Sequence, residues 1–461
     1  MKIQKISEIT ATLPFTEYDF LQKYRESFRQ SELGRIHAKL PLKEMAERLI
    51  PASSSGSRRG RKSLFPPEGE VALMFLKPYT GLSDDGLAEM LNGSLHMQMF
   101  CGVLIDPSEP LENGKIVSAI RNRLAALLDI VELQKTLYGH WKADLTDTDM
   151  FLTDATCYES HLRFPTDVKL LWECCEWLYG LLVEKSRLFG EKVPRTKYRE
   201  IEKARLIHAK QRKPKKSETR KIRRRLVHLL DRIVREWTRI NRITGGLTVL
   251  TPEQQKRVTA CRQVLEQQRI LIKGGTVNGR IVSIDRPYIR PIVRGKENRR
   301  VEFGAKVNSI QIDGISFMEH LSFEAFNEGT RLKECISCHK ELTGEEPKRI
   351  GADTIYATNA NRKLCTGKKI TTCFARKGPK PREEDAELST ARRIIGNLRA
   401  TVMEGSFGNQ KLHYGLGRIS ARNRRSEILQ IFFGIHMANA AIMAARQLAK
   451  DEEPKHQRKS A

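Results

Sequence analysis

Apolar residues recur at three- and four-residue intervals through most of the first 140 positions, a spacing typical of amphipathic helices. The longest such run places Ile116, Ile120, Leu124, Leu127 and Val131 on one helical face. Ser83, followed by two aspartates, is a good N-cap for a helix over 84–93. We therefore predict an all-helical N-terminal domain over 1–140, with a small, basic linker or arm at 52–63.

Two arginines near the end of this region leave the role of the domain open. Arg121 and Arg123 would allow their helix to read DNA. A helical bundle with no DNA role fits the same pattern equally well. DNA binding is our working hypothesis for this domain.

After residue 149 the pattern changes from helical spacing to runs of β-branched and apolar residues. The first run carries Asp154, and an apolar helix follows it. From residue 281 onwards further strands are expected, and Asp313-Gly314 between two β-rich runs is a strong hairpin signal. A short strand then ends at Asp353, and a long helical segment carries Glu404.

This order of elements is that of a ribonuclease H-like fold, in which a mixed sheet carries helices on its faces. Aspartates at the ends of two adjacent parallel strands and an acid on a later helix converge there, because sites in open α/β sheets lie at the carboxyl ends of strands. We predict an α/β protein with such a catalytic domain over 141–446, a large basic helical insertion at about 168–273, and a charged tail over 447–461.

Basic residues are in large excess, since 82 Lys and Arg stand against 55 Asp and Glu and give a net charge of +27. Residues 192–242 hold 20 of the basic residues and 5 of the acidic ones, a surplus of 15. Such a surplus serves to neutralise a polyanion, so we predict nucleic acid as the partner. The consecutive Arg223, Arg224 and Arg225 are predicted to bind DNA, with an ordinary solvated helix face as the alternative.

Three converging carboxylates repel one another unless cations lie between them, and hard oxygen ligands favour Mg²⁺ or Mn²⁺. Two such ions about 4 Å apart activate a water or a 3′-hydroxyl and stabilise the leaving oxygen of a phosphodiester displacement. The acids therefore predict metal-dependent cutting of a nucleic acid strand. A zinc site at Cys335-x-x-Cys338-His339 is the weaker alternative, because a second ligand pair at that spacing is missing.

Five stretches of the second half carry a more specific signal. They are "DATCYESHLRFPTDVKLLWE", "RPIVRGKENRRVEFGAKV", "FNEGTRL", "GADTIYATNANRKLC" and "MEGSFGNQKLHYGLGRISAR". In wording and order they resemble the motif blocks of DDE transposases of the IS5 family of bacterial insertion sequences. The earlier "LFPPEGEVALMFLKPYTGLSDDGLAEMLN" resembles the helical domain that precedes the catalytic domain in that family. The likeness extends from about residue 20 to 446.

The resemblance implies that Asp154, Asp353 and Glu404 form the catalytic, metal-binding triad. The predicted DNA contacts outside the basic insertion are Lys306, Lys411, Arg418 and Arg422, of which Lys411 resembles the family's basic residue that contacts the transposon end. Two positions depart from the family pattern, since Thr354 follows the second aspartate and Met403 precedes the glutamate. Neither departure removes a ligand.

The leading hypothesis is a DNA transposase that binds the terminal inverted repeats of its element, cleaves at their ends and joins the freed 3′-hydroxyls to target DNA. A domesticated or regulatory DNA-binding protein without transposition activity is the alternative, and a ribonuclease H-like nuclease without strand transfer is a third. Paired transposon ends imply at least a homodimer in the reaction. The nine cysteines show no disulfide framework, and neither a signal-peptide core nor a long apolar run is evident. We expect a cytoplasmic protein associated with the bacterial nucleoid, with no membrane partner.

Overall fold

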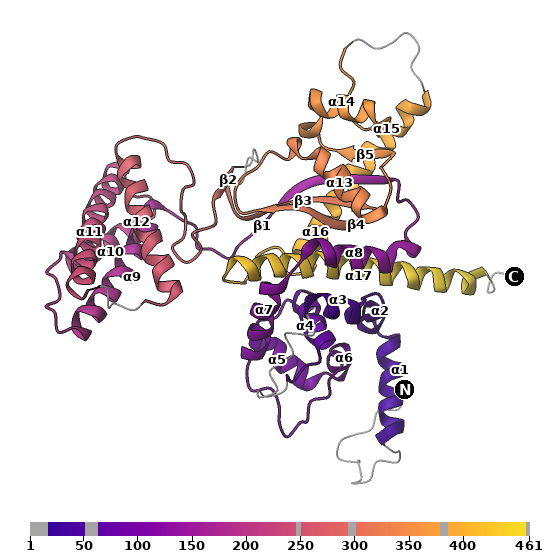
Figure 1. The fold of residues 1–461 in the computed structure, drawn as a ribbon, viewed down its shortest axis with the longest axis horizontal. Helices are drawn as coiled ribbons and strands as arrows, with labels where there is room; N and C mark the ends of the chain where they lie inside the picture. The colour runs from indigo at the N-terminus through magenta and orange to yellow at the C-terminus, as the bar shows by residue number, and fades with distance from the viewer. Residues whose placement is uncertain (1–16, 51–62, 246–249, 294–300, 379–385, 458–461) are drawn as a thin grey trace.

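The computed structural model describes residues 17–50, 63–245, 250–293, 301–378 and 386–457. The chain forms an N-terminal helical unit, a mixed sheet flanked by helices, and a helical lobe that projects to one side of the sheet (Figure 1). The mixed α/β class expected from the pattern of elements is confirmed. The linker predicted at 52–63 lies, apart from its last residue, outside the described residues.

The N-terminal unit is built from short helices. They are α1 (Glu17–Gln30), α2 (Glu32–Ala38), α3 (Leu42–Leu49), α4 (Pro67–Thr80), α5 (Asp84–Gly93), α6 (Leu95–Phe100), α7 (Lys115–Leu127), α8 (Ile130–Trp141) and the short η3 (Lys142–Asp144). Ser83 caps α5 as predicted, because its hydroxyl oxygen accepts a hydrogen bond from the backbone N–H three residues on, at 3.0 Å. Arg121 pairs with Asp84 at 2.8 Å, and Arg123 pairs with Glu70. Both arginines therefore tie α7 to its neighbours within the unit.

The long helix α17 (Arg424–Gln457) joins the N-terminal unit to the sheet. It packs against α2, α4 and α7 and also against strand β4 (Ile315–Ser322), and Figure 1 shows it running between the two parts. By length and composition its stretch Arg424–Glu452 could cross a membrane, but 72% of the most apolar part is buried inside the protein. This burial is the pattern of a core helix. The tail predicted from 447 begins within this helix.

Among the described residues the sheet has six strands. They are β1 (Met150–Glu159), β2 (Pro291–Val293), β3 (Val301–Ile312), β4, β5 (Arg349–Ala352) and β6 (Thr371–Thr372). Their spatial order is β2-β3-β1-β5-β6, with β4 paired to the long strand β3. β1 is antiparallel to β3 and parallel to β5, and β5 is parallel to β6. The predicted hairpin joins β3 to β4, and Asp313 and Gly314 at its turn have φ of 46° and 78°, as a two-residue type I′ turn requires.

Helices cover both faces of the central strand β1. One face is covered by α13 (Leu332–Thr343), and the other by the continuous run of α15 (Ala386–Leu398), η6 (Arg399–Met403) and α16 (Glu404–His413). The strands are connected by η4 (Glu328–Thr330), η5 (Thr354–Tyr356) and α14 (Asn359–Gly367). Leu152 packs with Met403 and Phe407. The Thr153 hydroxyl lies 3.5 Å from the Cys335 sulfur of α13, so successive side chains of β1 point to opposite helices.

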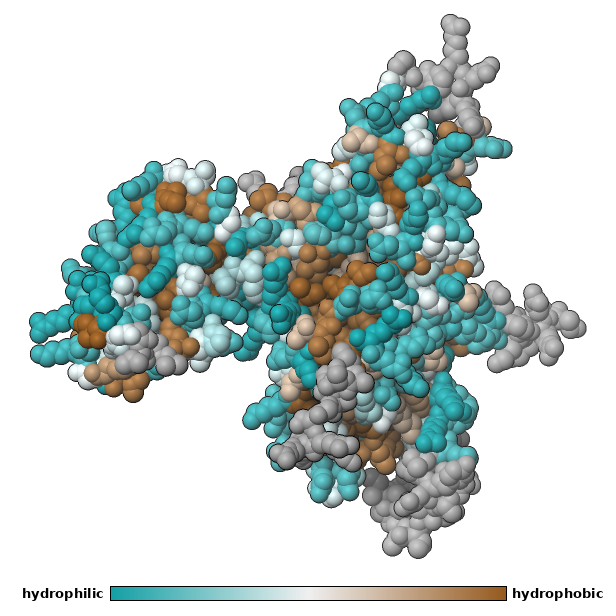
Figure 2. Space-filling view, viewed as in Figure 1, coloured by the Kyte–Doolittle hydropathy of each residue, from teal (hydrophilic) through white to brown (hydrophobic). Residues whose placement is uncertain are grey.

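The helical lobe lies in the chain between β1 and β2 and has a hydrophobic core of its own. Its helices are α9 (Asp167–Leu188), α10 (Tyr198–Lys210), α11 (Lys216–Ile243) and α12 (Pro252–Ile272). Leu226, Leu230, Ile233 and Trp237 line the buried stripe of α11. The lobe's visible surface is largely hydrophilic in Figure 2. The basic segment 192–242 is therefore mostly folded as helices, with its charges on the outside of a packed bundle.

Candidate carboxylate site

The register of two parallel strands brings the first two predicted carboxylates to neighbouring positions. Thr153 of β1 pairs with Ala352 of β5, and this is the last pair of their ladder. The next residues on the two strands are Asp154 and Asp353. Both therefore lie at the carboxyl end of the parallel ladder, where the two strands separate and side chains can converge.

The helical run α15–η6–α16 lies along the face of β1 that carries Asp154. Leu152 precedes the aspartate by two positions and packs against Met403 and Phe407. Thr156 follows it by two positions, and its hydroxyl oxygen accepts a hydrogen bond from the Lys411 ammonium at 2.8 Å. Side chains two apart on a strand share a face, so the aspartate must face the same helical run.

Arg399, the first residue of η6, lies between the two aspartates. Its Nη2 donates to Oδ2 of Asp154 at 2.8 Å and lies 3.5 Å from Oδ2 of Asp353. The other oxygen of each carboxylate accepts from the backbone N–H of the next residue, at 2.7 Å from Ala155 and 2.6 Å from Thr354. The two aspartates thus have the same arrangement, with Oδ1 held by the backbone and Oδ2 directed at one guanidinium nitrogen.

The third predicted carboxylate lies nearby but does not join the cluster. Glu404 follows η6 directly and is exposed, whereas the side chains of Asp154 and Asp353 are 17% and 41% exposed. Within the described ranges, no group of three or more His, Cys, Asp or Glu side chains lies close enough to hold a metal ion. The structure therefore brings together Asp154 and Asp353 but leaves Glu404 outside their contact.

The electrostatics of the cluster are set by burial and by Arg399. Burial raises the pKa of Asp154 above its usual value, although the hydrogen bond and charge of Arg399 act in the opposite direction. Burial by itself would lower the pKa of the Arg399 guanidinium, but the hydrogen bond to Asp154 and the attraction of Asp353 and Glu404 raise it above its usual value. The guanidinium therefore stays charged, and the negative charges of all three predicted acids attract it.

The oxygen donors of the two aspartates are of the kind that Mg²⁺ and Mn²⁺ prefer. Both ligands are hard carboxylate oxygens, and their Oδ2 atoms already converge on one positive group. Arg399 shows that a cation is accommodated between them. Asp154 and Asp353 therefore fit a divalent cation, whereas Glu404 would have to approach them to complete a three-carboxylate site.

The comparison with known families concerns the N-terminal part of the chain. Residues 21–123 match the family described as "Transposase domain (DUF772)". The chain carries a transposase domain. This domain coincides with the N-terminal helical unit from within α1 into α7, and it implies a DNA-processing enzyme with DNA as its partner. No curated protein and no solved structure gives a significant match to the chain.

The transposase domain contains none of the three predicted acids. The match therefore supports a transposase, but it says nothing of the IS5 family, the DDE type or the metal.

Both lysines that were predicted to contact DNA make hydrogen bonds inside the protein. The Lys306 side chain is buried on β3, and its ammonium donates to the Phe326 carbonyl at 2.8 Å and pairs with Glu328. A DNA contact by this ammonium would require both bonds to break. Lys411 is half-buried, and its ammonium binds the Thr156 hydroxyl on the face of β1 that carries Asp154.

The predicted arginine contacts divide into exposed and paired side chains. Arg418 and Arg422 are exposed on the segment after α16, where Ile419 forms a bridge to Ser160 just past the end of β1. In the lobe, Arg223 binds Gln268 at 2.9 Å and Asp167 at 3.3 Å, and Arg225 binds Glu200 at 2.6 Å. Arg224 between them is exposed. The three consecutive arginines therefore do not form one free basic cluster.

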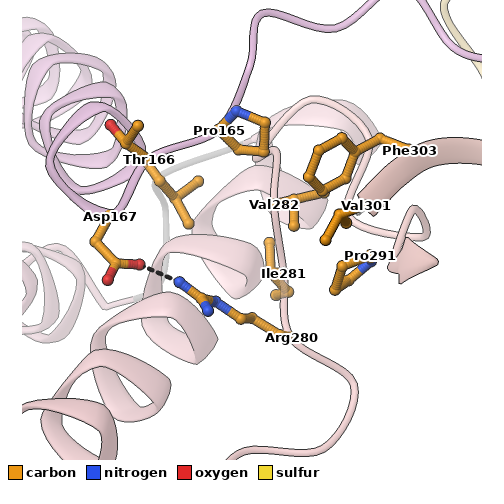
Figure 3. A pocket seen from close by; sticks show the side chains of 10 residues that line it. Pro165, Thr166, Asp167, Arg280, Ile281, Val282, Pro291, Val301 and Phe303 are labelled. Atoms are coloured by element: carbon orange, nitrogen blue, oxygen red, sulfur yellow. Dashed lines mark hydrogen bonds and ion pairs between the residues drawn. The ribbon is translucent and has the colours of Figure 1, made fainter. Parts of the chain in front are cut away.

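Two cavities lie in or beside the lobe, away from the carboxylates. The smaller, of about 140 Å³, is where the lobe meets the sheet, and its paired charges are Asp167 and Arg280 (Figure 3). The larger, of about 840 Å³, is lined by six Lys or Arg residues and three acids, with the Trp172 ring among them. Asp154 and Asp353 line neither cavity. The larger groove is thus a basic surface to which the predicted basic segment 192–242 contributes four of the six Lys or Arg residues.

The alternative zinc site has no support among the described residues. Cys335 is buried and close to Thr153, and His339 is buried with its ring nitrogens near the Thr148 and Glu345 carbonyls. Burial lowers the pKa of His339 and raises that of the Cys335 thiol, so both stay neutral. These groups belong to the packing of α13 on the sheet.

Proposed function

We propose that the protein is a DDE transposase that cuts and joins DNA at a site built by Asp154, Asp353 and Glu404. The observation that carries the proposal is the pairing of Thr153 with Ala352, which sets Asp154 and Asp353 side by side at the end of two parallel strands. The transposase domain at 21–123 independently supports a transposase, although not the DDE type or these residues. The order of the five strands β4-β3-β1-β5-β6, in which only β3 runs antiparallel to the others, is that expected of a ribonuclease H-like sheet.

The carboxylates would hold one or two Mg²⁺ or Mn²⁺ ions. When bound, such ions supply activation of a water or 3′-hydroxyl and stabilise the oxygen that leaves phosphorus. Asp154 and Asp353 are fixed by the strands and by their backbone hydrogen bonds, so their oxygens are already oriented. Glu404, exposed on the first turn of α16, would complete the ligand set by approaching them.

Basic side chains around this face would hold the DNA backbone. Lys411 lies on the site face of β1, and Arg418 and Arg422 are exposed next to its end. Their cations bind phosphates and fix the position of the strand, but they carry no sequence information. The basic groove of the lobe offers a second place for a phosphate backbone. Sequence-specific binding to the inverted repeats is assigned to the transposase domain, and joining of two ends requires at least two copies of the chain.

The test uses purified protein, Mg²⁺ and labelled DNA that carries the inverted repeats of the element. We expect cleavage at the repeat ends by the wild type, and no cleavage but unchanged DNA binding by Asp154→Asn. Glu334→Gln is the matched control, because it removes an exposed carboxylate of α13 on the opposite side of β1. Cleavage by Asp154→Asn at the wild-type rate would refute the assignment.

The alternative is a regulatory DNA-binding protein that derives from a transposase and no longer cuts DNA. The ion pairs of Arg399 give this alternative a concrete basis, because they occupy the two aspartates. It predicts that the wild type binds the inverted repeats but cleaves nothing at any Mg²⁺ or Mn²⁺ concentration. The same cleavage assay therefore separates the two functions.

A further inference from the structure

One guanidinium nitrogen occupies the place at which the two aspartates converge. Arg399 Nη2 is the atom that approaches Oδ2 of Asp154 and Oδ2 of Asp353. The Arg399 side chain is only 18% exposed, and its buried Nε has no hydrogen-bond partner among the described residues. An arginine that leaves a buried donor unpaired is held there by its carboxylates rather than by a complete set of hydrogen bonds.

The local helix geometry directs Arg399 towards the third acid as well. Arg399 and Glu404 are five residues apart, which would place them roughly 140° apart around a regular α-helix. η6 is a π-helical turn over Arg399–Met403. Its i→i+5 hydrogen bonding brings residues five apart to the same face, and such turns are rare and often occur at functional sites.

We propose that Arg399 is an internal counter-cation that holds the carboxylate site together without metal, and that a divalent ion must displace its guanidinium in order to bind. The inference rests on the proposed metal-dependent function. Asp154 and Asp353 would otherwise repel each other, and one positive group between them removes that repulsion. A metal ion and the guanidinium cannot use the same two Oδ2 atoms in this arrangement, so they compete.

Displacement of Arg399 would also allow Glu404 to move towards the two aspartates. In the present arrangement the acid is exposed, and its charge is attracted to Arg399. Once the guanidinium leaves the aspartates, the negative charge that remains attracts divalent ions, and Glu404 on the adjoining turn is free to serve as a ligand. Arg399 is thus a positioning residue for the acids and not a ligand itself.

The experiment measures Mn²⁺ binding to the full chain by the electron paramagnetic resonance signal of free Mn²⁺, without DNA and without turnover. Arg399→Gln keeps a side chain of similar length without the charge. We expect it to bind Mn²⁺ about tenfold more tightly than the wild type, because the competing ion pair is gone. In EDTA the same variant should unfold at a lower temperature than the wild type, and Mn²⁺ should raise its midpoint more.

Three further proteins make the result decisive. Arg393→Gln removes an exposed positive charge from α15 and should match the wild type, Arg399→Lys should restore the weaker binding, and Asp154→Asn should lose the site. If Arg399→Gln binds Mn²⁺ as the wild type does while Asp154→Asn does not, the metal site is correct and the competition is wrong. If neither the wild type nor Arg399→Gln binds Mn²⁺, the proposed metal-dependent function fails as well.

Discussion

The change Glu427→Gln tests the junction that fixes the helical lobe to the site. Glu427, in the first turn of α17, is fully buried. Its carboxylate accepts hydrogen bonds from the Ser160 hydroxyl at 2.5 Å, the Tyr288 hydroxyl at 2.7 Å and the Arg286 guanidinium at 3.0 Å. Ser160 follows the end of β1, and Arg286 and Tyr288 lie on the segment that returns from the lobe. One carboxylate therefore joins three parts of the chain.

The expected loss follows from the charge that the substitution leaves behind. Glutamine can still accept from Tyr288, but Arg286 is only 5% exposed and would be a buried cation without a counter-ion. Removing one partner of a buried ion pair costs about 3–5 kcal/mol. The reverse change, Arg286→Met, should cost less. Burial already raises the pKa of Glu427, against the effect of its hydrogen bonds, so the carboxyl group can take up a proton when its cation is absent.

Urea unfolding of the main core is the assay. Trp141 belongs to that core, whereas Trp172 and Trp237 lie in the lobe's core and Trp177 packs against it. Because two cores need not unfold in one transition, the lobe tryptophans are replaced by phenylalanine in all variants. The double variant Glu427→Gln/Arg286→Met should be more stable than Glu427→Gln alone. A loss below about 1 kcal/mol for Glu427→Gln, or a double variant that shows the sum of the single losses, would refute the reasoning.

Four other changes have distinct expected results. His436 is fully buried, and burial lowers its pKa to about 3. Between about pH 6.5 and 3, only the unfolded chain therefore takes up a proton at this residue, so the stability of the folded protein should fall as the pH drops through that range. Its replacement His436→Met should flatten this dependence in unfolding midpoints measured at pH 7 and pH 5. Arg224→Gln should weaken DNA binding and lower the salt slope by about 1 without loss of stability, whereas Arg223→Gln should lower stability because Asp167 loses a partner. Lys306→Met should lower the midpoint of unfolding and leave DNA affinity in a filter-binding assay unchanged, because the Lys306 ammonium is bound by Glu328. Weaker DNA binding at unchanged stability would contradict this prediction.

Periodicity and turn chemistry predicted the parts of the fold that depend on local sequence. The cap at Ser83 and the hairpin at Asp313-Gly314 are specified by a few adjacent residues, and both are as expected. The neighbouring positions of Asp154 and Asp353 also follow from the expected parallel strands, because the ladder fixes which residues come next to each other. Local patterns thus sufficed for the elements and for the pair of aspartates.

The partners of the basic side chains could not be predicted in the same way. Arg223 is bound by Gln268 and Asp167, which lie on other helices of the lobe, so its spacing on α11 gives no hint of them. Lys306 lies on a strand, where a shift of one residue exchanges the buried and exposed faces. Arg399 escaped notice because α-helical spacing directs it away from Glu404, and the sequence carries no recognisable signal for a π-helical turn.

The same long-range contacts explain how the chain carries a large insertion next to a precise site. β1 and β3 are antiparallel neighbours, and Glu159 at the end of β1 pairs with Gly304 of β3, so the lobe and β2 form the connection of a long hairpin. Lengthening such a connection costs little closure entropy, provided that its two ends are fixed. Ser160 and Arg286 are those ends, and Glu427 binds both. The lobe can therefore carry its basic groove, the surface proposed to hold DNA, while the register that sets Asp154 beside Asp353 stays unchanged. Loss of the Glu427 junction should disturb the site although Glu427 touches neither aspartate.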